Sequence, residues 1–143
     1  IARRIERHAF SAGTRLRHSP KQTSELAGLI LYRNSQNYLE LLKGKDGLQL
    51  RRHEKGHMTL IAQVPYKESE VELWVESDGE KFQFYYGQDE TQRKPIGEPL
   101  SVQTLSDEVA AGFNGPFVGM YATSEGNSSK QAASFAWFEY HNR

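Results

Sequence analysis

One motif in the sequence matches a metal-dependent catalytic pattern. His53-Glu54-Lys55-Gly56-His57 fits H-E-x-x-H, in which two histidines bind zinc and the glutamate acts as a general base. That chemistry needs a helix, because only there do residues i and i+4 bring both imidazoles to one ion. Here Gly56 interrupts the motif, and apolar and polar residues alternate on both sides of it. We therefore interpret the motif as a turn between two strands and expect no bound metal.

No pair of acids suited to glycoside hydrolysis can be recognised. Such a pair projects into a cleft from two rigid positions. Most acids of this chain lie instead on the polar sides of predicted strands or in turns, as Glu72, Glu76, Asp78, Glu80, Asp89 and Glu90 do. The glycines are too scattered for a phosphate-binding loop, and no serine nucleophile has a local signature. We expect no catalytic residue in this chain and no cofactor.

Two aromatic residues alternate with the apolar members of their predicted strands. Trp74 lies between Leu73 and Val75, and Tyr85 follows Phe84. The two rings could form a platform on which a sugar stacks, or they could be the second buried side of strands that pack under loops. We favour packing and keep the sugar platform as the alternative.

A large apolar ring lies within a stretch of turn-forming residues. Gly112-Phe113-Asn114-Gly115-Pro116 combines glycines, which allow positive φ, with a proline, which fixes φ and lacks a donor. Full burial of a Phe is favourable by roughly 1.5–3 kcal/mol, so exposing Phe113 to water brings no gain. Either this loop folds back over its own core, or another surface covers the ring.

Composition excludes several classes of protein. The 143 residues include 18 basic and 18 acidic side chains without a long run of one sign, which argues against a nucleic-acid partner. No apolar run approaches the roughly 20 residues that span a bilayer. The absence of cysteine favours a reducing compartment, so we expect the cytoplasm, although secreted proteins without cysteine also exist. Because the chain begins with Ile1, we expect a fragment or a processed product.

A period of two runs through nearly the whole chain and predicts the fold class. Strands are expected at 14–18, 27–33, 38–43, 48–51, 58–64, 71–76, 82–86, 117–122 and 133–140. Asp78-Gly79 predicts a type I′ hairpin, and Met58, Leu60, Ala62 and Val64 are expected on one side of their strand. Many short strands separated by turns indicate an all-β fold, with two antiparallel sheets packed as a sandwich over residues 1–143.

Several segments together resemble one family. Ala27-Gly28-Leu29, Tyr32, Asn34 and Asn37-Tyr38 resemble the A-G-L-x-x-Y-x-N-x-x-N-Y hairpin of concanavalin A-like sandwiches, which have a jelly-roll fold. The ordered set is similar to the C-terminal sandwich of family 43 glycoside hydrolases, the β-xylosidases and α-L-arabinofuranosidases. The set consists of 3–4, 14–16, 27–29, 82–86, 96–97, 105–108, 112–119 and 135–138.

The resemblance implies an accessory role. In that family the catalytic acids lie in an N-terminal five-bladed propeller, and the mechanism is inverting. A loop of the sandwich reaches the propeller's active site and places an aromatic ring at its rim, which corresponds here to Phe113, flanked by Gly112 and Asn114. The last strand departs from the family's A-D-F-D-W-F, because Ser134 and Ala136 replace both acids. Any calcium site that used those acids is therefore not expected here.

Three functions follow from these observations. The leading hypothesis is an accessory sandwich that packs on a catalytic propeller and helps to bind xylo- or arabino-oligosaccharides at a shared site. The second is an autonomous carbohydrate-binding module that uses Trp74 and Tyr85. The third is a structural or adhesion sandwich. Exposure distinguishes the first two, because a module requires both rings to be bare.

Overall fold

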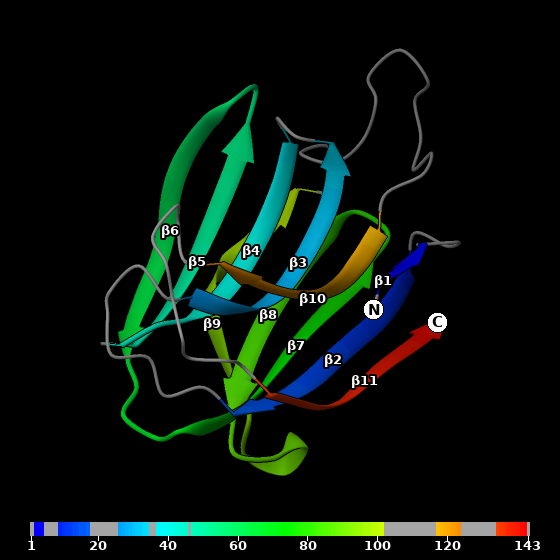
Figure 1. Cartoon of the computed structure of the whole chain (residues 1–143). Coiled ribbons are helices and arrows are strands. Elements are labelled where there is room, and N and C mark those ends of the chain that lie inside the picture. Colours follow the sequence, from blue (N-terminus) through cyan, green and yellow to red (C-terminus); the bar gives the residue numbers. More distant parts are fainter. Residues whose placement is uncertain are drawn as a thin grey trace.

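The chain forms two antiparallel sheets that face each other (Figure 1). The structure is a computed structural model and describes residues 2–4, 9–17, 26–34, 37–45, 47–101, 117–123 and 134–142. Within these ranges sheet A has the order β1-β10-β3-β4-β5-β6, and sheet B has the order β11-β2-β7-β8-β9. This confirms the predicted all-β fold of two antiparallel sheets.

The strands agree with most of the predicted segments. Their bounds are β1 (Ala2–Arg4), β2 (Ala9–Arg17), β3 (Leu26–Asn34), β4 (Asn37–Lys43), β5 (Gly47–Glu54), β6 (His57–Pro65), β7 (Glu70–Asp78), β8 (Lys81–Gly87), β9 (Lys94–Ser101), β10 (Phe117–Thr123) and β11 (Ser134–Asn142). A short 3-10 helix, η1 (Glu90–Gln92), precedes β9 and is capped by the Asp89 side chain. No helix of the described segments is long and apolar enough to cross a membrane.

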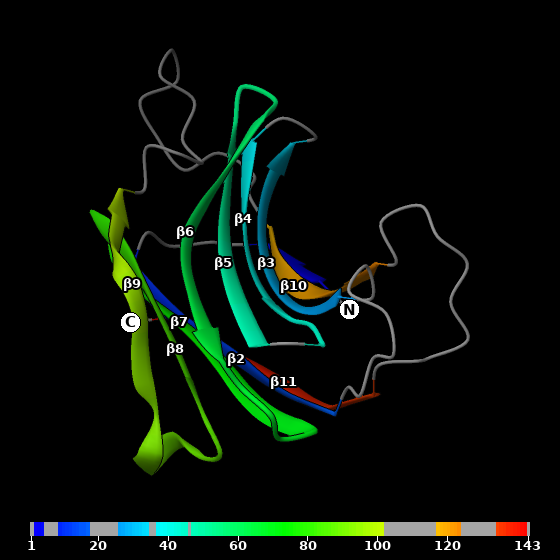
Figure 2. The ribbon, with the colours of Figure 1, turned by 90° about the vertical axis from the view of Figure 1, so that its left-hand side faces the viewer.

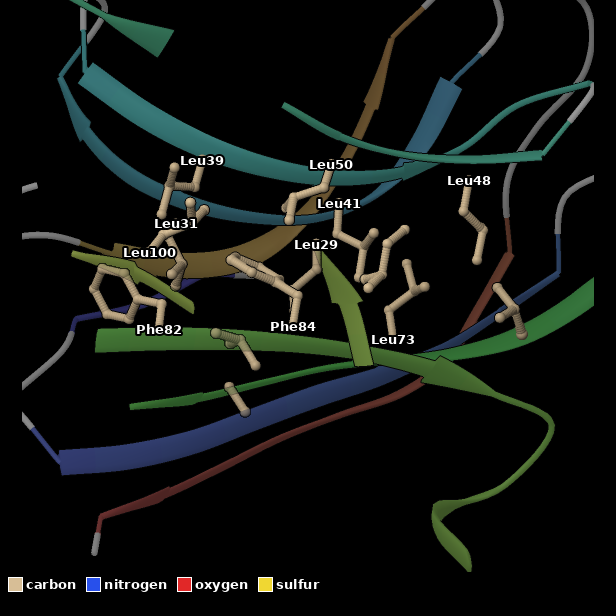
Figure 3. Close-up of a cluster of buried hydrophobic side chains, with 14 of the residues drawn as sticks. Leu29, Leu31, Leu39, Leu41, Leu48, Leu50, Leu73, Phe82, Phe84 and Leu100 are labelled. Carbon is tan, nitrogen blue, oxygen red and sulfur yellow. The ribbon is translucent and has the colours of Figure 1, made fainter. Parts of the chain in front are cut away.

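The core lies between the sheets and follows the alternation of the sequence. Leucines of β3, β4 and β5 face phenylalanines and aliphatic residues of the other sheet (Figure 3). The buried cluster contains Phe10, Ala12, Leu16, Ala27, Leu29, Leu31, Leu39, Leu41, Leu48, Leu50, Val71, Leu73, Val75, Phe82, Phe84, Ile96 and Leu100. Burying one such side chain is favourable by roughly 1.5–3 kcal/mol, so this cluster is the main source of stability.

The type I′ turn that the sequence predicted for the β7–β8 hairpin lies instead in the β5–β6 hairpin. Strands β7 and β8 do form a hairpin, but only Gly79 has positive φ, at 99°. Asp78 instead accepts bonds from the backbone N–H of Glu80 and Lys81, at 2.8 and 2.9 Å. A type I′ turn needs two residues with positive φ, and these are Lys55 (53°) and Gly56 (81°) in the β5–β6 hairpin.

A bulge in β6 overturns one prediction about its faces. Leu50 pairs with Ala62, but the next residue, Arg51, pairs with Leu60, so Ile61 is the extra residue. The extra residue reverses the side-chain alternation, so Met58 and Leu60 share the face of Arg51 and His53. The expectation that Met58 and Leu60 lie on one side with Ala62 and Val64 is therefore wrong.

The two sheets differ in shape. The strands of sheet A bend, and the hollow side of the bend faces away from sheet B (Figure 2). At one end of sheet A lie the β3–β4 and β5–β6 hairpins. A bond from the backbone N–H of Lys55 to Asn37 Oδ1, 3.1 Å long, joins these two hairpins. Strand β10 begins at the same end, since Phe117 pairs with Tyr32.

Candidate functional site: the outer faces of the two sheets

The H-E-x-x-H motif is the β5–β6 hairpin, as its glycine predicted. In the register His53 pairs with Met58, and Glu54 pairs with His57. Successive residues of a strand point to opposite faces, so the two histidines lie on opposite sides of the hairpin and cannot share one ion. Among the residues that the structure describes, no group of three or more His, Asp or Glu side chains could hold a metal.

His53 has a different role, as the partner of a buried carboxylate. Glu40 is 4% exposed, and its Oε2 lies 3.1 Å from Nε2 of His53. A buried carboxylate is costly without a hydrogen-bond donor or a cation. The His53 ring also stacks on Tyr38, with ring centroids 3.9 Å apart and planes 12° from parallel. His53 therefore stabilises Glu40 and holds the ring of Tyr38 in place.

These contacts form part of a row across the outer face of sheet A. The register aligns Tyr32 of β3, Tyr38 of β4, His53 of β5 and Met58 of β6. The Tyr32 and Tyr38 rings lie 5.9 Å apart. The next row places Leu60 beside Arg51. The described large apolar side chains with substantial exposure are Tyr32 (38%), Met58 (53%) and Leu60 (46%), and all three belong to this face.

The outer face of sheet B is arranged differently, and the predicted sugar platform is not present on it. The Trp74 side chain is buried, with 4% exposed. Its ring lies over Gly13 of β2, which is its partner in the register. The guanidinium carbon of Arg93 lies 4.5 Å from the ring centroid of Tyr85 and 5.7 Å from that of Trp74. Arg93 therefore covers the face on which a sugar would stack.

Ion pairs hold this cover in place. Arg93 donates to Glu76 Oε2 at 2.7 Å. On the other side of Trp74, Arg15 donates to Glu72 Oε2 at 3.0 Å, and the indole N–H of Trp74 donates to Glu72 Oε1 at 3.2 Å. The neighbouring strands β2 and β7 and the segment before β9 supply these groups. The arrangement satisfies the polar atoms around Trp74 and leaves its ring inaccessible to a ligand.

The residues predicted at an active-site rim, Gly112, Phe113 and Asn114, lie outside the described residues, as do the side chains of Ser134 and Ala136. Their roles stay predictions. The strand that follows this loop is described and begins at Phe117, opposite Tyr32. The predicted loop thus leads into the end of sheet A that carries the row of aromatic residues.

The row on sheet A was not recognised in the sequence. In the sequence Tyr32 and Tyr38 belong to the family's hairpin motif, and His53 belongs to the H-E-x-x-H motif. Regular pairing outward from Asn34 and Asn37 would place Arg33 opposite Tyr38, and Tyr32 pairs with Tyr38 only because the register shifts by one residue between Tyr32 and Asn34. Met58 could not have been added either, since its side depends on the bulge at Ile61.

A comparison with known families decides the identity of this sandwich. The sequence model of the family described as "Beta xylosidase C-terminal Concanavalin A-like domain" matches residues 1–141. The chain belongs to this family. This confirms the resemblance to the C-terminal sandwich of family 43 glycoside hydrolases, and the two-sheet architecture is the one that the family's name describes.

Relatives of the xylosidase sandwich are enzymes several times its length. The chain is 28% identical over 139 residues to a xylosidase/arabinosidase of Butyrivibrio fibrisolvens, covering 94% of this chain and 27% of the relative. It is 27% identical to a non-reducing end α-L-arabinofuranosidase of Bacteroides ovatus, covering 98% of this chain and 27% of the relative. The chain thus spans little more than a quarter of the curated relatives that it matches.

Solved structures of the family agree with the fold. The family 43 protein BlXynB of Bacillus licheniformis superposes with a TM-score of 0.88 at 28% identity, over 99% of this chain and 29% of that protein. The xylan β-1,4-xylosidase of Bacillus halodurans superposes with a TM-score of 0.87 at 27% identity, again over 99% and 29%. The chain is the C-terminal domain type of xylosidases and arabinosidases of family 43.

Proposed function

We propose that this chain is the accessory sandwich of a xylosidase- or arabinofuranosidase-like glycoside hydrolase, forming one domain over residues 1–143. In this proposal it packs on the catalytic propeller of the same polypeptide and adds the loop around Phe113 to the rim of the active site. The observation that carries the proposal is the match over residues 1–141 to a domain that makes up 27–29% of known xylosidases and arabinosidases.

The described acids support a role without catalysis of its own. Inverting hydrolysis needs one protonated acid and one free carboxylate about 6.5–9.5 Å apart across an open site. Here Glu40 is buried against His53, Glu72 binds Arg15, and Glu76 binds Arg93. Each carboxylate therefore has a structural partner, and the paired acids are spread over both outer faces rather than gathered at one cleft.

The loop around Phe113 would act on substrate binding. A sugar pocket in a propeller is open to water at its rim, and an aromatic ring there can pack on the apolar face of a pentose. Ring stacking contributes roughly 0.5–1.5 kcal/mol beyond the area it buries. The names of the relatives favour xylose or arabinose units as the substrate, and the cytoplasm is the compartment that we propose.

The first experiment reads the reading frame upstream of the codon for Ile1. We expect it to encode a propeller with its own paired acids, and an upstream frame without one would overturn the proposal. The second experiment compares Phe113→Ala with the wild-type parent enzyme on aryl xyloside and aryl arabinofuranoside. We expect kcat/KM to fall by roughly 3- to 10-fold with an unchanged melting temperature.

A matched control uses Lys81, an exposed residue at the start of β8 in sheet B. Lys81→Ala should leave kcat/KM unchanged. The purified sandwich without the propeller should release no nitrophenol from either substrate. Wild-type kcat/KM in Phe113→Ala would remove the rim loop from the proposal, and hydrolysis by the sandwich alone would overturn the accessory role.

A further inference from the structure

The outer face of sheet A exposes apolar side chains that the rest of the described surface does not. Tyr32, Met58 and Leu60 are the large apolar residues with substantial exposure in the described ranges, and they lie in two adjacent rows of one face. Neighbouring strands lie about 4.8 Å apart, so the row from Tyr32 to Met58 spans roughly 15 Å. Scattered exposed residues are ordinary, but such a gathering marks an interaction surface.

The composition of this face suits a protein partner. Aromatic residues, Met and Arg are enriched in the centres of protein interfaces, and the two rows contain Tyr32, Tyr38, Met58 and Arg51. The rings are also held before binding. Tyr38 lies between Tyr32 and His53, and Glu40 fixes His53. Side chains that are already ordered lose little entropy when a partner covers them.

The path of the chain indicates which partner this is. In the relatives nearly three quarters of the polypeptide lies outside this domain, and the family's domain is the C-terminal one. In a protein of this arrangement, the upstream part of the polypeptide leads directly into β1, which is the edge strand of sheet A. The register continues from Ala2, the first residue of β1, through Gly119 of β10 to Ile30, in the row that ends at Leu60. The upstream segment thus enters sheet A about two strand spacings, or roughly 10 Å, from Ile30, in the row next to that of Tyr32.

From these observations we infer that the outer face of sheet A, built around Tyr32, Tyr38, Met58 and Leu60, is the docking surface for the upstream domain of the same polypeptide. This inference rests on the proposed function, because it needs an upstream domain. It adds the face that makes the contact. The outer face of sheet B is less suited to docking, because ion pairs and Arg93 already cover the ring of Trp74 there. The predicted rim loop enters β10 at the same end of sheet A, so docking here brings that loop to the partner.

The test measures accessibility in the full-length parent protein. The domain has no cysteine, so Leu60→Cys and Lys94→Cys each introduce one thiol into it, and mass spectrometry of the labelled peptide follows its reaction with a maleimide. Lys94 is an exposed residue of β9 in sheet B and serves as the matched control. We expect Leu60→Cys to react at least about tenfold more slowly than Lys94→Cys in the native protein, and equally fast in urea. Equal native rates would overturn the inference.

A second pair of variants checks the coupling between domains. Leu60→Glu should separate the thermal unfolding of the parent into two transitions, because it places a charge in the interface while the side chain is exposed within the sandwich. Lys94→Glu should keep the wild-type profile. One unchanged transition in Leu60→Glu would contradict the docking surface.

Other occupants would give different results. Slow labelling of Leu60→Cys in the sandwich alone, increasing with protein concentration, would identify a second copy instead. Slow labelling only with added xylo-oligosaccharide would identify a sugar site, and either result would overturn the inference.

If Phe113→Ala lowers kcat/KM while Leu60→Cys labels freely, the proposed function stands and only the docking face is wrong. If no catalytic domain lies upstream, the proposed function fails as well.

Discussion

On sheet B the ring of Trp74 lies on Gly13 and beneath Arg93 and is 4% exposed, whereas on sheet A Tyr32, which lies beside Tyr38, is 38% exposed. Both sets of aromatic residues occupy the outer side of their strands. The difference is made by neighbours from distant parts of the chain, such as Arg93 and Glu76. An aromatic residue on the polar side of a strand is therefore not by itself a binding site. Such a residue can bind a ligand only if no other side chain of the domain already covers its ring.

The largest effect is expected where the cover of sheet B is tightest. A Cβ atom at Gly13 would lie 2.3 Å from Cε3 of Trp74, well inside van der Waals contact. Gly13→Ala should therefore lower the free energy of unfolding by about 1–3 kcal/mol, as overpacking does. Urea denaturation measures this loss.

The matched background for this test is Trp74→Leu, which removes the ring that the new methyl group meets. In that background Gly13→Ala should cost much less, so the two changes should be strongly coupled. An equal cost in both backgrounds would show that the ring of Trp74 is not held over Gly13.

The next effect concerns the cation over the two rings. Arg93→Ala removes the bond to Glu76 and the contacts with Tyr85 and Trp74, so we expect a loss of about 1–2 kcal/mol. Arg93→Lys keeps the charge but not the flat guanidinium, so its free energy of unfolding should lie between those of the wild type and Arg93→Ala. The exposed neighbour Lys94→Ala should stay within about 0.5 kcal/mol. If Arg93→Ala were as mild as Lys94→Ala, the cover would not be a stabilising feature of sheet B.

A gain is expected at the end of β4, on the inner side of sheet A. Lys43 is 3% exposed, and burial lowers the pKa of its ammonium group. Its Nζ lies 5.9 Å from the centroid of the Tyr66 ring. Below the lowered pKa the lysine is charged in both states, so the folded state carries the full cost of burying the charge. Lys43→Met should therefore raise the free energy of unfolding by about 1 kcal/mol.

The pH dependence of this gain has a definite sign. Because the pKa is lower in the folded state, the unfolded chain binds more protons between the two pKa values, and wild-type stability rises with pH there. The advantage of Lys43→Met should thus shrink as the pH rises through the lowered folded-state pKa towards 10.5. The exposed Lys45→Met is the control and should change little. A less stable Lys43→Met variant would contradict this account.

The smallest effect is expected on the open face of sheet A. Leu60→Ala in the sandwich alone should change the free energy of unfolding by less than about 0.5 kcal/mol, since nearly half of the side chain is already exposed. Leu50→Ala, in the core of the adjacent strand, should cost about 2–5 kcal/mol. Similar losses for both variants would mean that Leu60 is covered within the domain, and that the two outer faces are alike.

The alternation of apolar and polar residues predicted the strands well, but it did not always predict the face of the sheet on which a side chain lies. Leu39 and Leu41 of β4 and Leu48 and Leu50 of β5 alternate in the sequence as they do in the core, because at these positions one side of the sheet packs on the other sheet. The same rule failed for Met58 and Leu60, since one extra residue at Ile61 reverses the side. The type I′ turn also lay at Lys55-Gly56, inside a motif that resembles a zinc site, rather than at Asp78-Gly79.

The sequence by itself determined the all-β class, most of the strands, the β5–β6 and β7–β8 hairpins and the family. These properties depend on alternation and turn residues within a few positions of each other, and on ordered motifs that survive at 27–28% identity. Only the tertiary structure decided that Arg93 covers Trp74, that His53 pairs with Glu40, and that Tyr32, Tyr38 and Met58 share one row. Arg93 and Trp74 lie 19 positions apart, and His53 and Glu40 lie 13 positions apart, so both contacts depend on strand registers. The row of Tyr32, Tyr38 and Met58 depends on two register shifts that no local preference specifies.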